Sequence, residues 1–163
     1  MNLPQRKPNR LKHWDYSQPG AYFVTICTRN KAKILCDIVG DGAHAVPRVI
    51  LSEYGKIVDT YIRSANHMNR VTVDKYVIMP NHIHLIVFVT GDNGTARAPS
   101  PTNAVIPRMV ATLKRLTTKQ IGAPLFQRSF HDHIIRDEGD YQMIWQYIDQ
   151  NPLKWELDCF YIP

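Results

Sequence analysis

The sequence predicts one α+β domain, in which helices cover one face of an antiparallel β-sheet. The chain has 163 residues, which is long enough to bury a hydrophobic core and is typical of a single domain. Short runs rich in β-branched and aromatic residues alternate with segments whose apolar residues recur at helical spacing. These segments follow the order strand, helix, strand, strand, helix, strand, helix. We therefore expect a single domain over residues 1–163.

The first strand and the first helix are expected in the N-terminal third. Residues 21–29 (AYFVTICTR) form the strand, and the Gly-, Asp- and Pro-containing segment after it predicts an excursion with a short strand or hairpin. A helix begins after Ser52, which is suited to be its N-cap, because apolar residues recur at helical spacing from Tyr54 to Ile62.

An antiparallel hairpin is expected in the middle of the chain. Two extended runs, 71–80 and 82–89, are separated by Pro80 and Asn81, a pair that initiates turns. The next segment, about 90–103, is rich in Gly, Pro, Ser and Asn and predicts a mobile loop.

The last elements are a helix, a strand and a second helix. A helix is expected over 104–122 with Gly122 as its stop, followed by a strand over 129–136. The final helix begins after Asp137, and its stripe of Tyr141, Ile144, Trp145 and Ile148 is expected to pack on the core. The first six elements match the β-α-β-β-α-β order of ferredoxin-like folds.

The charge of the chain points to a polyanionic partner. The formal net charge is +6 with the seven histidines counted as neutral. Positive residues gather in a basic N-terminal arm (1–14), at 29–33 and on the helix at 104–122. One such cluster is typical of a solvated surface, but three favour binding to a phosphate backbone. The candidate nucleic-acid contacts are Arg10, Lys12, Lys114 and Arg115.

Nothing in the sequence indicates a membrane or secreted protein. No apolar run approaches the roughly 20 residues of a membrane span, and the N-terminus lacks the apolar region of a signal peptide. The three cysteines form no C-x-x-C pair, which suits reduced thiols in a cytoplasmic protein.

Two histidines on one strand are the first candidate for chemistry. His82 and His84 alternate with apolar residues, so both imidazoles project from the same face. A metal ion satisfies two neutral imidazoles in an apolar strand, although a site also needs a third ligand. His131 and His133 form a second pair with the same spacing. They either bind phosphate or support the site, or they are simply residues on the face of the sheet.

The last helix offers a second candidate. At about 100° per residue, Tyr147 and Asn151 lie only about 40° apart on the rim of its buried face. An amide oxygen is a hard metal ligand and a phenol is a nucleophile, so the two residues could serve one site. Alternatively, Tyr147 is a packing residue at the boundary of the core and Asn151 is the helix C-cap.

Two segments together, "MPNHIHLIV" and "YIDQNPLKW", resemble the small single-tyrosine HUH transposases. The segments "LKHWDYSQPGAYFVTICTRN" and "FHDHIIRDE" are similar to the REP-associated subgroup, and the resemblance spans about residues 10–155. The resemblance implies a ferredoxin-like fold, His82 and His84 as metal ligands, and Tyr147 as nucleophile. It also implies Asn151 as the last ligand, with Gln150 as a less favoured alternative.

The resemblance further implies cleavage and rejoining of single-stranded or hairpin DNA through a 5′-phosphotyrosine intermediate, with Mg²⁺ or Mn²⁺ as cofactor. Relatives of this kind act as monomers or as homodimers, and the sequence does not choose between them. Two other interpretations stay open: a domesticated descendant that binds nucleic acid without catalysis, and a metal-dependent phosphoesterase in which Tyr147 only packs.

Overall fold

The computed structural model describes residues 18–40, 47–91 and 104–162. Its main sheet has four antiparallel strands in the order β4-β5-β1-β6, and β2 and β3 form a separate hairpin between β1 and the first helix. The strands are β1 Gly20–Cys27, β2 Cys36–Val39, β3 Arg48–Leu51, β4 Val71–Met79, β5 His82–Val89 and β6 His131–Ile135. This strand order confirms the ferredoxin-like prediction, and the β2-β3 hairpin confirms the expected excursion.

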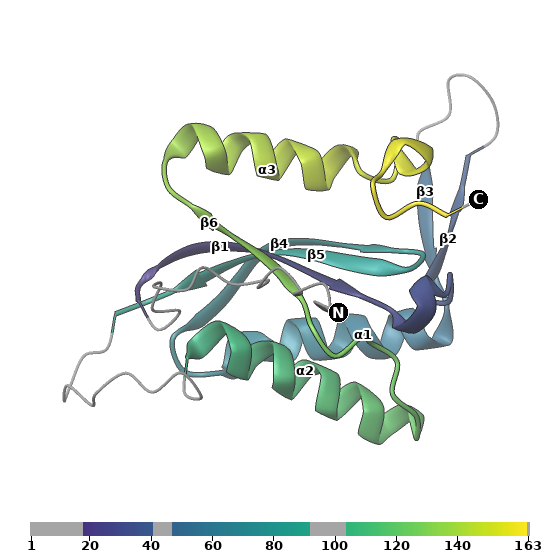
Figure 1. Cartoon of the computed structure of the whole chain (residues 1–163), viewed down its shortest axis with the longest axis horizontal. Helices are drawn as coiled ribbons and strands as arrows, with labels where there is room; N and C mark the ends of the chain where they lie inside the picture. The colour runs from purple at the N-terminus through teal and green to yellow at the C-terminus, as the bar shows by residue number, and fades with distance from the viewer. Residues whose placement is uncertain (1–17, 41–46, 92–103, 163) are drawn as a thin grey trace, which may run out of the picture.

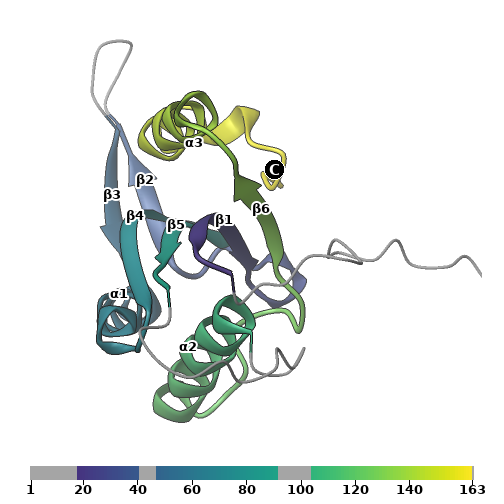
Figure 2. The same ribbon diagram turned by 90° about the vertical axis from the view of Figure 1, so that its left-hand side faces the viewer.

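Helices cover both faces of the main sheet (Figures 1 and 2). Two helices, α1 (Glu53–Ser64) and α2 (Val105–Ile121), lie side by side on one face and enclose the larger hydrophobic core. The third helix, α3 (Glu138–Gln150), lies across the opposite face, where Ile148 packs with Ile86 and Ile135 in a smaller core. The two helices of the ferredoxin-like unit therefore share one face as expected, and the added helix takes the other.

The helix boundaries follow the predicted capping residues. The Ser52 hydroxyl accepts a hydrogen bond from the amide of Gly55 at 3.1 Å, and α1 begins at the next residue after Ser52. Gly122 ends α2 with a φ of 81°, a left-handed conformation that favours glycine. The Asp137 carboxylate accepts from the amide of Asp140 at 2.9 Å and caps α3.

One packing expectation for α3 was wrong. Trp145 is 37% exposed rather than part of the core. The ammonium group of Lys75 lies 3.2 Å from the centroid of the indole ring and forms an ion pair with Asp149 at 2.8 Å. The indole ring thus lies at the edge of the buried stripe, where Lys75 of β4 covers one of its faces by a cation–π contact.

Several sequence expectations lie outside the described residues. The basic arm 1–14, with Arg10 and Lys12, is one of them, and so is nearly all of the segment 90–103. Among the described residues, no helix is long and apolar enough to cross a membrane.

Candidate functional site

The hairpin of β4 and β5 places the two candidate histidines at the start of β5, an inner strand of the sheet. The strands turn at Pro80 and Asn81, and β5 begins at His82. His82 and His84 lie between β1 and β4, opposite Cys27 and Thr25 of β1. Their side chains are 0% and 1% exposed, so both rings are fully buried.

The ring of His82 has a defined tautomer because Asn81 is held on its other side. The Asn81 amide nitrogen donates to the carbonyl oxygen of Phe160 at 2.9 Å, which turns the amide oxygen toward Nδ1 of His82 at 2.8 Å. An amide oxygen only accepts, so Nδ1 of His82 carries the proton. The other ring nitrogen, Nε2, is therefore left with a free lone pair.

The two imidazoles meet at their Nε2 atoms. Nε2 of His82 lies 3.0 Å from Nε2 of His84, whose Nδ1 lies 2.7 Å from the hydroxyl of Thr25. Burial lowers the pKa of His82 to about 3 and also lowers that of His84. Two neutral rings that face each other at this distance need either one shared proton or a cation between them.

Helix α3 brings the candidate tyrosine and asparagine to this pair. The Tyr147 hydroxyl lies 3.3 Å from Nε2 of His84, and its ring packs against Phe23 and His84. Asn151 is the residue after the end of α3 and is 2% exposed. Gln150 is turned outward, where its amide oxygen accepts from Lys154 at 2.8 Å. The structure thus buries Asn151 beside Tyr147 and the histidines, whereas Gln150 only lines the pocket that opens beside Tyr147.

A carboxylate that the sequence did not indicate completes the cluster. Asp158 follows a short 3₁₀ helix, η3 (Trp155–Leu157), and its Oδ2 accepts from the Tyr147 hydroxyl at 2.8 Å. The same oxygen accepts from the Asn151 amide nitrogen at 2.7 Å and lies 4.0 Å from Nε2 of His84. Asp158 is seven residues beyond Asn151 and outside any helical periodicity, so no pattern in the sequence could have placed it here.

The Asp158 carboxylate alters the acid–base properties of the site. Burial by itself raises the pKa of Asp158, but interactions with His84, the Phe160 amide, Asn151 and Tyr147 outweigh burial and hold it well below its usual range. Burial and the adjacent carboxylate both raise the pKa of Tyr147. The phenol is consequently protonated near neutral pH in this arrangement.

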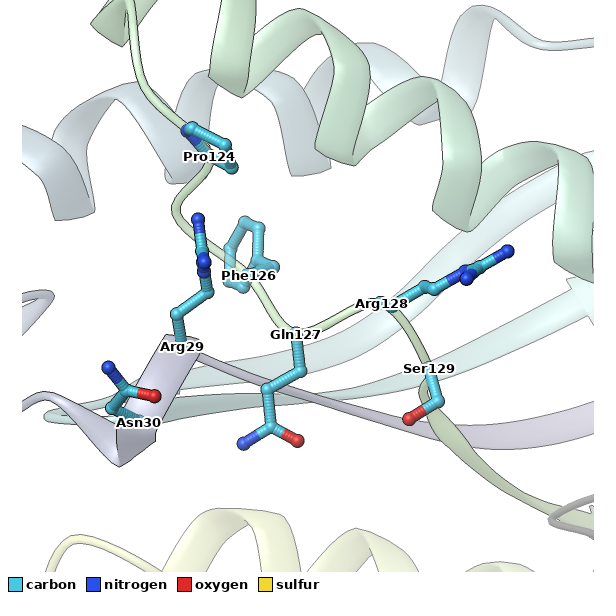
Figure 3. Close-up of a pocket in the computed structure, with 7 residues that line it drawn as sticks. All are labelled: Arg29, Asn30, Pro124, Phe126, Gln127, Arg128 and Ser129. Atoms are coloured by element: carbon cyan, nitrogen blue, oxygen red, sulfur yellow. The ribbon is translucent and has the colours of Figure 1, made fainter.

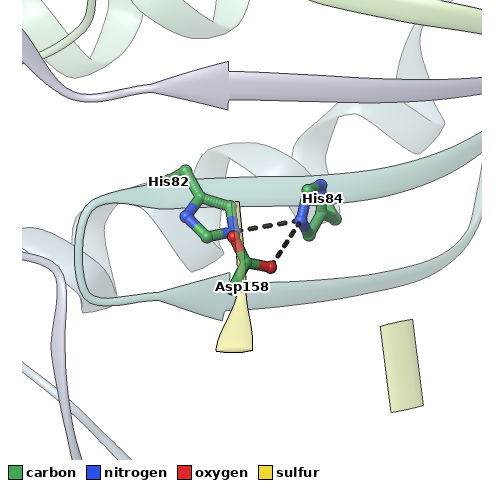
Figure 4. Close-up of side chains that lie close together, drawn as sticks. All are labelled: His82, His84 and Asp158. Carbon is green, nitrogen blue, oxygen red and sulfur yellow. Dashed lines mark hydrogen bonds and ion pairs between the residues drawn. The ribbon is translucent and has the colours of Figure 1, made fainter. Parts of the chain in front are cut away.

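The donor atoms of the cluster fit a divalent metal ion. His82, His84 and Asp158 each offer one ligand atom, and these atoms lie within 4.8 Å of one another (Figure 4). Among the described residues, the buried amide oxygen of Asn151 has no hydrogen-bond partner, because its amide nitrogen is turned to Asp158. Two imidazoles, a carboxylate and an orphaned amide oxygen are a ligand set that binds Mn²⁺ or another divalent ion.

Aromatic rings enclose the cluster. Phe160 and Trp155 lie 4.8 Å and 5.9 Å from the ring of His82, measured between ring centroids, and Phe23 stacks on His84 at 5.1 Å. A small pocket of about 110 Å³ opens beside Tyr147, and Lys154 is among its lining residues. Gln150 also lines this pocket, and its amide oxygen holds the Lys154 ammonium there.

The remaining candidates from the sequence lie away from the cluster. The Lys114 ammonium donates to backbone carbonyl oxygens of the segment 127–129, at 2.7 to 3.3 Å, and Arg115 is exposed on α2. His131 is exposed, with its ring 6.0 Å from that of Phe160, and His133 pairs with Asp140 at 2.8 Å. Neither residue of the second histidine pair belongs to the ligand set.

Comparison with known proteins gives relatives along nearly the whole chain. No family model matches the sequence. A protein of Haemophilus influenzae named only "Uncharacterized protein" is 31% identical over 177 residues, which covers 98% of this chain and 95% of that protein. A second protein of the same organism, named "Putative REP-associated tyrosine transposase", is 26% identical and covers 86% of this chain and 74% of its own length.

A solved structure shares the fold. It is described as the structure of a REP-associated tyrosine transposase bound to a REP hairpin, and it superposes with a TM-score of 0.60 at 19% identity. The superposition covers 95% of this chain and 74% of that one.

Proposed function

The chain belongs to the REP-associated tyrosine transposase family, and on this premise we propose that it cleaves and rejoins hairpin-containing single-stranded DNA. The proposed intermediate is a 5′-phosphotyrosine at Tyr147. The observation that carries the proposal is the 3.3 Å separation between the Tyr147 hydroxyl and Nε2 of His84. A nucleophile next to a candidate metal ligand set is the arrangement that metal-assisted phosphoryl transfer requires.

We propose that His82, His84, Asn151 and Asp158 hold the cofactor, Mg²⁺ or Mn²⁺. Histidine nitrogens suit Mn²⁺ better than Mg²⁺, which prefers oxygen ligands alone. When bound, such an ion supplies Lewis-acid polarisation of the scissile phosphate. Asn81 and Thr25 support this role by holding the imidazole rings of His82 and His84 from behind.

The chemical step uses the Tyr147 oxygen as nucleophile. This oxygen attacks phosphorus, the bond from phosphorus to the 3′ oxygen breaks, and the leaving oxygen takes up a proton to become a free 3′-OH. Oδ2 of Asp158 accepts the hydrogen bond of the phenol and orients its oxygen, and the phenol proton passes to solvent, because a carboxylate whose pKa is held this low is a weak base. Because the pKa of Tyr147 is raised, we expect proton loss to accompany attack instead of preceding it.

We propose hairpin DNA as the partner, by analogy with the relative of known structure, and the bacterial cytoplasm as the place of action. The net charge of +6 supports a nucleic-acid partner. The nucleophile and both histidines lie in one chain, which supports a monomer that completes its site in cis. Arg115, exposed on α2, stays a candidate DNA contact, whereas Lys114 binds backbone carbonyls of its own chain.

A second candidate function is nucleic-acid binding without catalysis. Two observations favour it. The histidines are buried beneath Asp158 and Phe160, so a phosphate cannot reach them in this arrangement. The raised pKa of Tyr147 also keeps the phenol protonated, which opposes its attack on phosphorus. It predicts that hairpin DNA binds but stays intact.

Labelled substrate separates these functions. Hairpin oligonucleotides labelled at the 5′ end or at the 3′ end are incubated with the protein and Mn²⁺, then resolved under denaturing conditions. Our proposal expects the 3′-labelled fragment to stay attached to protein and the 5′-labelled fragment to be free with a 3′-OH. Two free fragments would indicate a phosphoesterase, and an intact oligonucleotide would indicate the binding function.

A further inference from the structure

His131, the first residue of β6, lies outside the proposed ligand set but on the same face of the sheet. In the strand register, Thr25 of β1 is opposite His84 of β5 on one side and opposite His131 of β6 on the other. Residues that are directly opposite one another in adjacent antiparallel strands project from the same face. The side chains of His84, Thr25 and His131 therefore form one row, in which β1 separates the two histidines.

The ring of Phe160 contacts both ends of this row. Its centroid lies 4.8 Å from the ring centroid of His82, 5.8 Å from that of His84 and 6.0 Å from that of His131. The ammonium of Lys31, in the turn after β1, is also 6.0 Å from the Phe160 centroid. A phosphate that takes the place of this ring would lie among the two candidate metal ligands, a lysine and a third histidine.

The imidazole of His131 is available for proton transfer, unlike that of the second histidine on β6. Nε2 of His133 lies 2.8 Å from Oδ2 of Asp140, and this ion pair occupies the ring. Among the residues that the structure describes, the ring nitrogens of His131 have no hydrogen-bond partner, and the side chain is exposed. Both nitrogens of His131 are therefore free to exchange a proton with a substrate.

Backbone hydrogen bonds fix the start of β6, and with it His131, beside β1. The amide of Arg29 donates to the carbonyl oxygen of Leu125 at 2.9 Å, and the amide of Gln127 donates to that of Cys27 at 2.9 Å. Figure 3 shows the segment that leads into β6, with Gln127, next to the turn that carries Arg29. A side chain on such a rigid element keeps a constant position relative to the reacting atoms.

The proposed nucleophile and His131 lie on opposite sides of β1. The hydroxyl of Tyr147 is 3.3 Å from Nε2 of His84, on the side of β5, whereas His131 belongs to the edge strand β6. In phosphoryl transfer the attacking oxygen and the leaving oxygen are roughly in line through phosphorus. A phosphate above Thr25 that Tyr147 attacks from the side of β5 would therefore direct its leaving oxygen toward His131.

We propose that His131 is the general acid that protonates the leaving 3′ oxygen during cleavage, and the general base of the rejoining step. The proposal rests on the proposed function, since it assigns one more catalytic residue to the same reaction. Imidazole suits both roles because it gains and loses a proton near neutral pH.

The two steps return His131 to its starting state. In cleavage, the Tyr147 oxygen attacks phosphorus, the bond from phosphorus to the 3′ oxygen breaks, and the imidazolium of His131 gives its proton to that oxygen. In rejoining, neutral His131 takes the proton of a 3′-OH while the oxygen of this group attacks phosphorus. The Tyr147 oxygen then leaves and regains a proton from solvent.

The test replaces the leaving 3′ oxygen by sulfur, at the bond that the labelled hairpins identify as the cleavage site. A thiolate leaves without being protonated, so this substrate needs no general acid. Formation of the Tyr147 adduct is timed in single turnovers with Mn²⁺ on the oxygen and the sulfur substrate. We expect His131→Ala to slow the reaction of the oxygen substrate by about 10²- to 10⁴-fold, the usual contribution of a general acid. The sulfur substrate should react at nearly the wild-type rate.

Two variants control for a merely structural effect. His133→Ala removes the other histidine of β6, and Lys31→Gln removes the charge next to Phe160. Both should keep the wild-type ratio of the oxygen and sulfur rates, because neither residue is proposed to protonate the leaving atom. Equal slowing of both substrates by His131→Ala, or no slowing of either, would overturn the assignment. Rescue of Lys31→Gln by sulfur would transfer the role of acid to Lys31.

The rejoining step gives a second measurement. The sulfur substrate loads His131→Ala with an ordinary 5′-phosphotyrosine adduct, to which an oligonucleotide with a 3′-OH is then added. Resealing should be slowed by a similar factor in His131→Ala, and resealing at the wild-type rate would contradict the role of base. A wild-type adduct on both substrates without sulfur rescue of His131→Ala would remove only the role of His131. The absence of any wild-type adduct would contradict the proposed function as well.

Discussion

The Tyr147 hydroxyl lies 3.3 Å from Nε2 of His84, although 63 positions separate the two residues in the chain. The contact forms because α3 crosses the face of the sheet that α1 and α2 leave open, with Ile148 buried against Ile86 as its anchor. Asp158 accepts the hydrogen bond of the same phenol and places a carboxylate beside the imidazole. Substitutions can therefore test whether these side chains bind a metal ion, which contacts stabilise the fold around them, and whether Tyr147 reacts with DNA.

Removing one histidine should abolish stabilisation by metal. At a Mn²⁺ concentration of about 100 times Kd, the wild-type protein should gain about 2.7 kcal/mol, which raises Tm by about 5 to 10 °C. His82→Ala should remove this increase, as measured by thermal unfolding with and without Mn²⁺. His133→Ala, which changes an exposed histidine that pairs with Asp140, should keep it. A full Mn²⁺ response in His82→Ala would disprove the ligand assignment.

Neutralising Asp158 should weaken metal binding while a side chain of similar shape is kept. Asp158→Asn is expected to reduce Mn²⁺ affinity by about tenfold or more in calorimetric titration, since a charged oxygen ligand is replaced by a neutral one. Glu156→Gln removes the same charge from an exposed residue of η3 and serves as the matched control. Equal Mn²⁺ affinities in Asp158→Asn and wild type would show that Asp158 is not a ligand.

Lys114 should contribute to stability more than its neighbour does. Burial lowers the pKa of Lys114 to about 8, so the ammonium is still largely charged at neutral pH while it binds three carbonyl oxygens. Lys114→Met leaves those carbonyls without their donor and should cost about 1 to 3 kcal/mol in denaturant unfolding. Arg115→Met, at the next and exposed position, should change stability by less than about 0.5 kcal/mol. Similar effects from both variants would contradict the structural role of Lys114.

Gly55 should not tolerate a side chain. A Cβ atom at this position of α1 would overlap the carbonyl oxygen of Leu35, which also accepts hydrogen bonds from Ser52. We expect Gly55→Ala to destabilise the fold by about 1 to 3 kcal/mol, in spite of the higher helix propensity of alanine. Gly40→Ala, just after β2, is the control, because its Cβ would meet only Pro47, at an ordinary van der Waals distance of 3.6 Å. Equal stability of Gly55→Ala and wild type would show that α1 can shift away from Leu35.

The order of elements and their boundaries could be predicted because they depend on local chemistry. Ser52, Gly122 and Asp137 end or begin helices through hydrogen bonds and backbone conformations that each residue type favours by itself. The alternation of β5 likewise places His82 and His84 on one face. These features hold whatever the rest of the chain does.

The sequence could not predict contacts that depend on how the chain folds back. Helical periodicity shows that α3 has an apolar side, but not which face of the sheet it covers, and it placed Trp145 too deep. Asp158 reaches the histidines only because η3 reverses the chain after α3. The sequence also made Lys114 a candidate nucleic-acid contact, because it does not show that the three carbonyl partners of Lys114 come from a segment beyond its own helix.

The covalent adduct between Tyr147 and DNA tests the proposed function most directly. The protein is incubated with a hairpin oligonucleotide and Mn²⁺, denatured, digested and examined by mass spectrometry for a nucleotide-bearing peptide. Wild-type protein should give an adduct on the peptide that contains Tyr147, and Tyr147→Phe should give none while its affinity for the hairpin stays within about twofold. An adduct that persists in Tyr147→Phe, or one that maps to another residue of the wild-type protein, would contradict the assignment of Tyr147 as nucleophile.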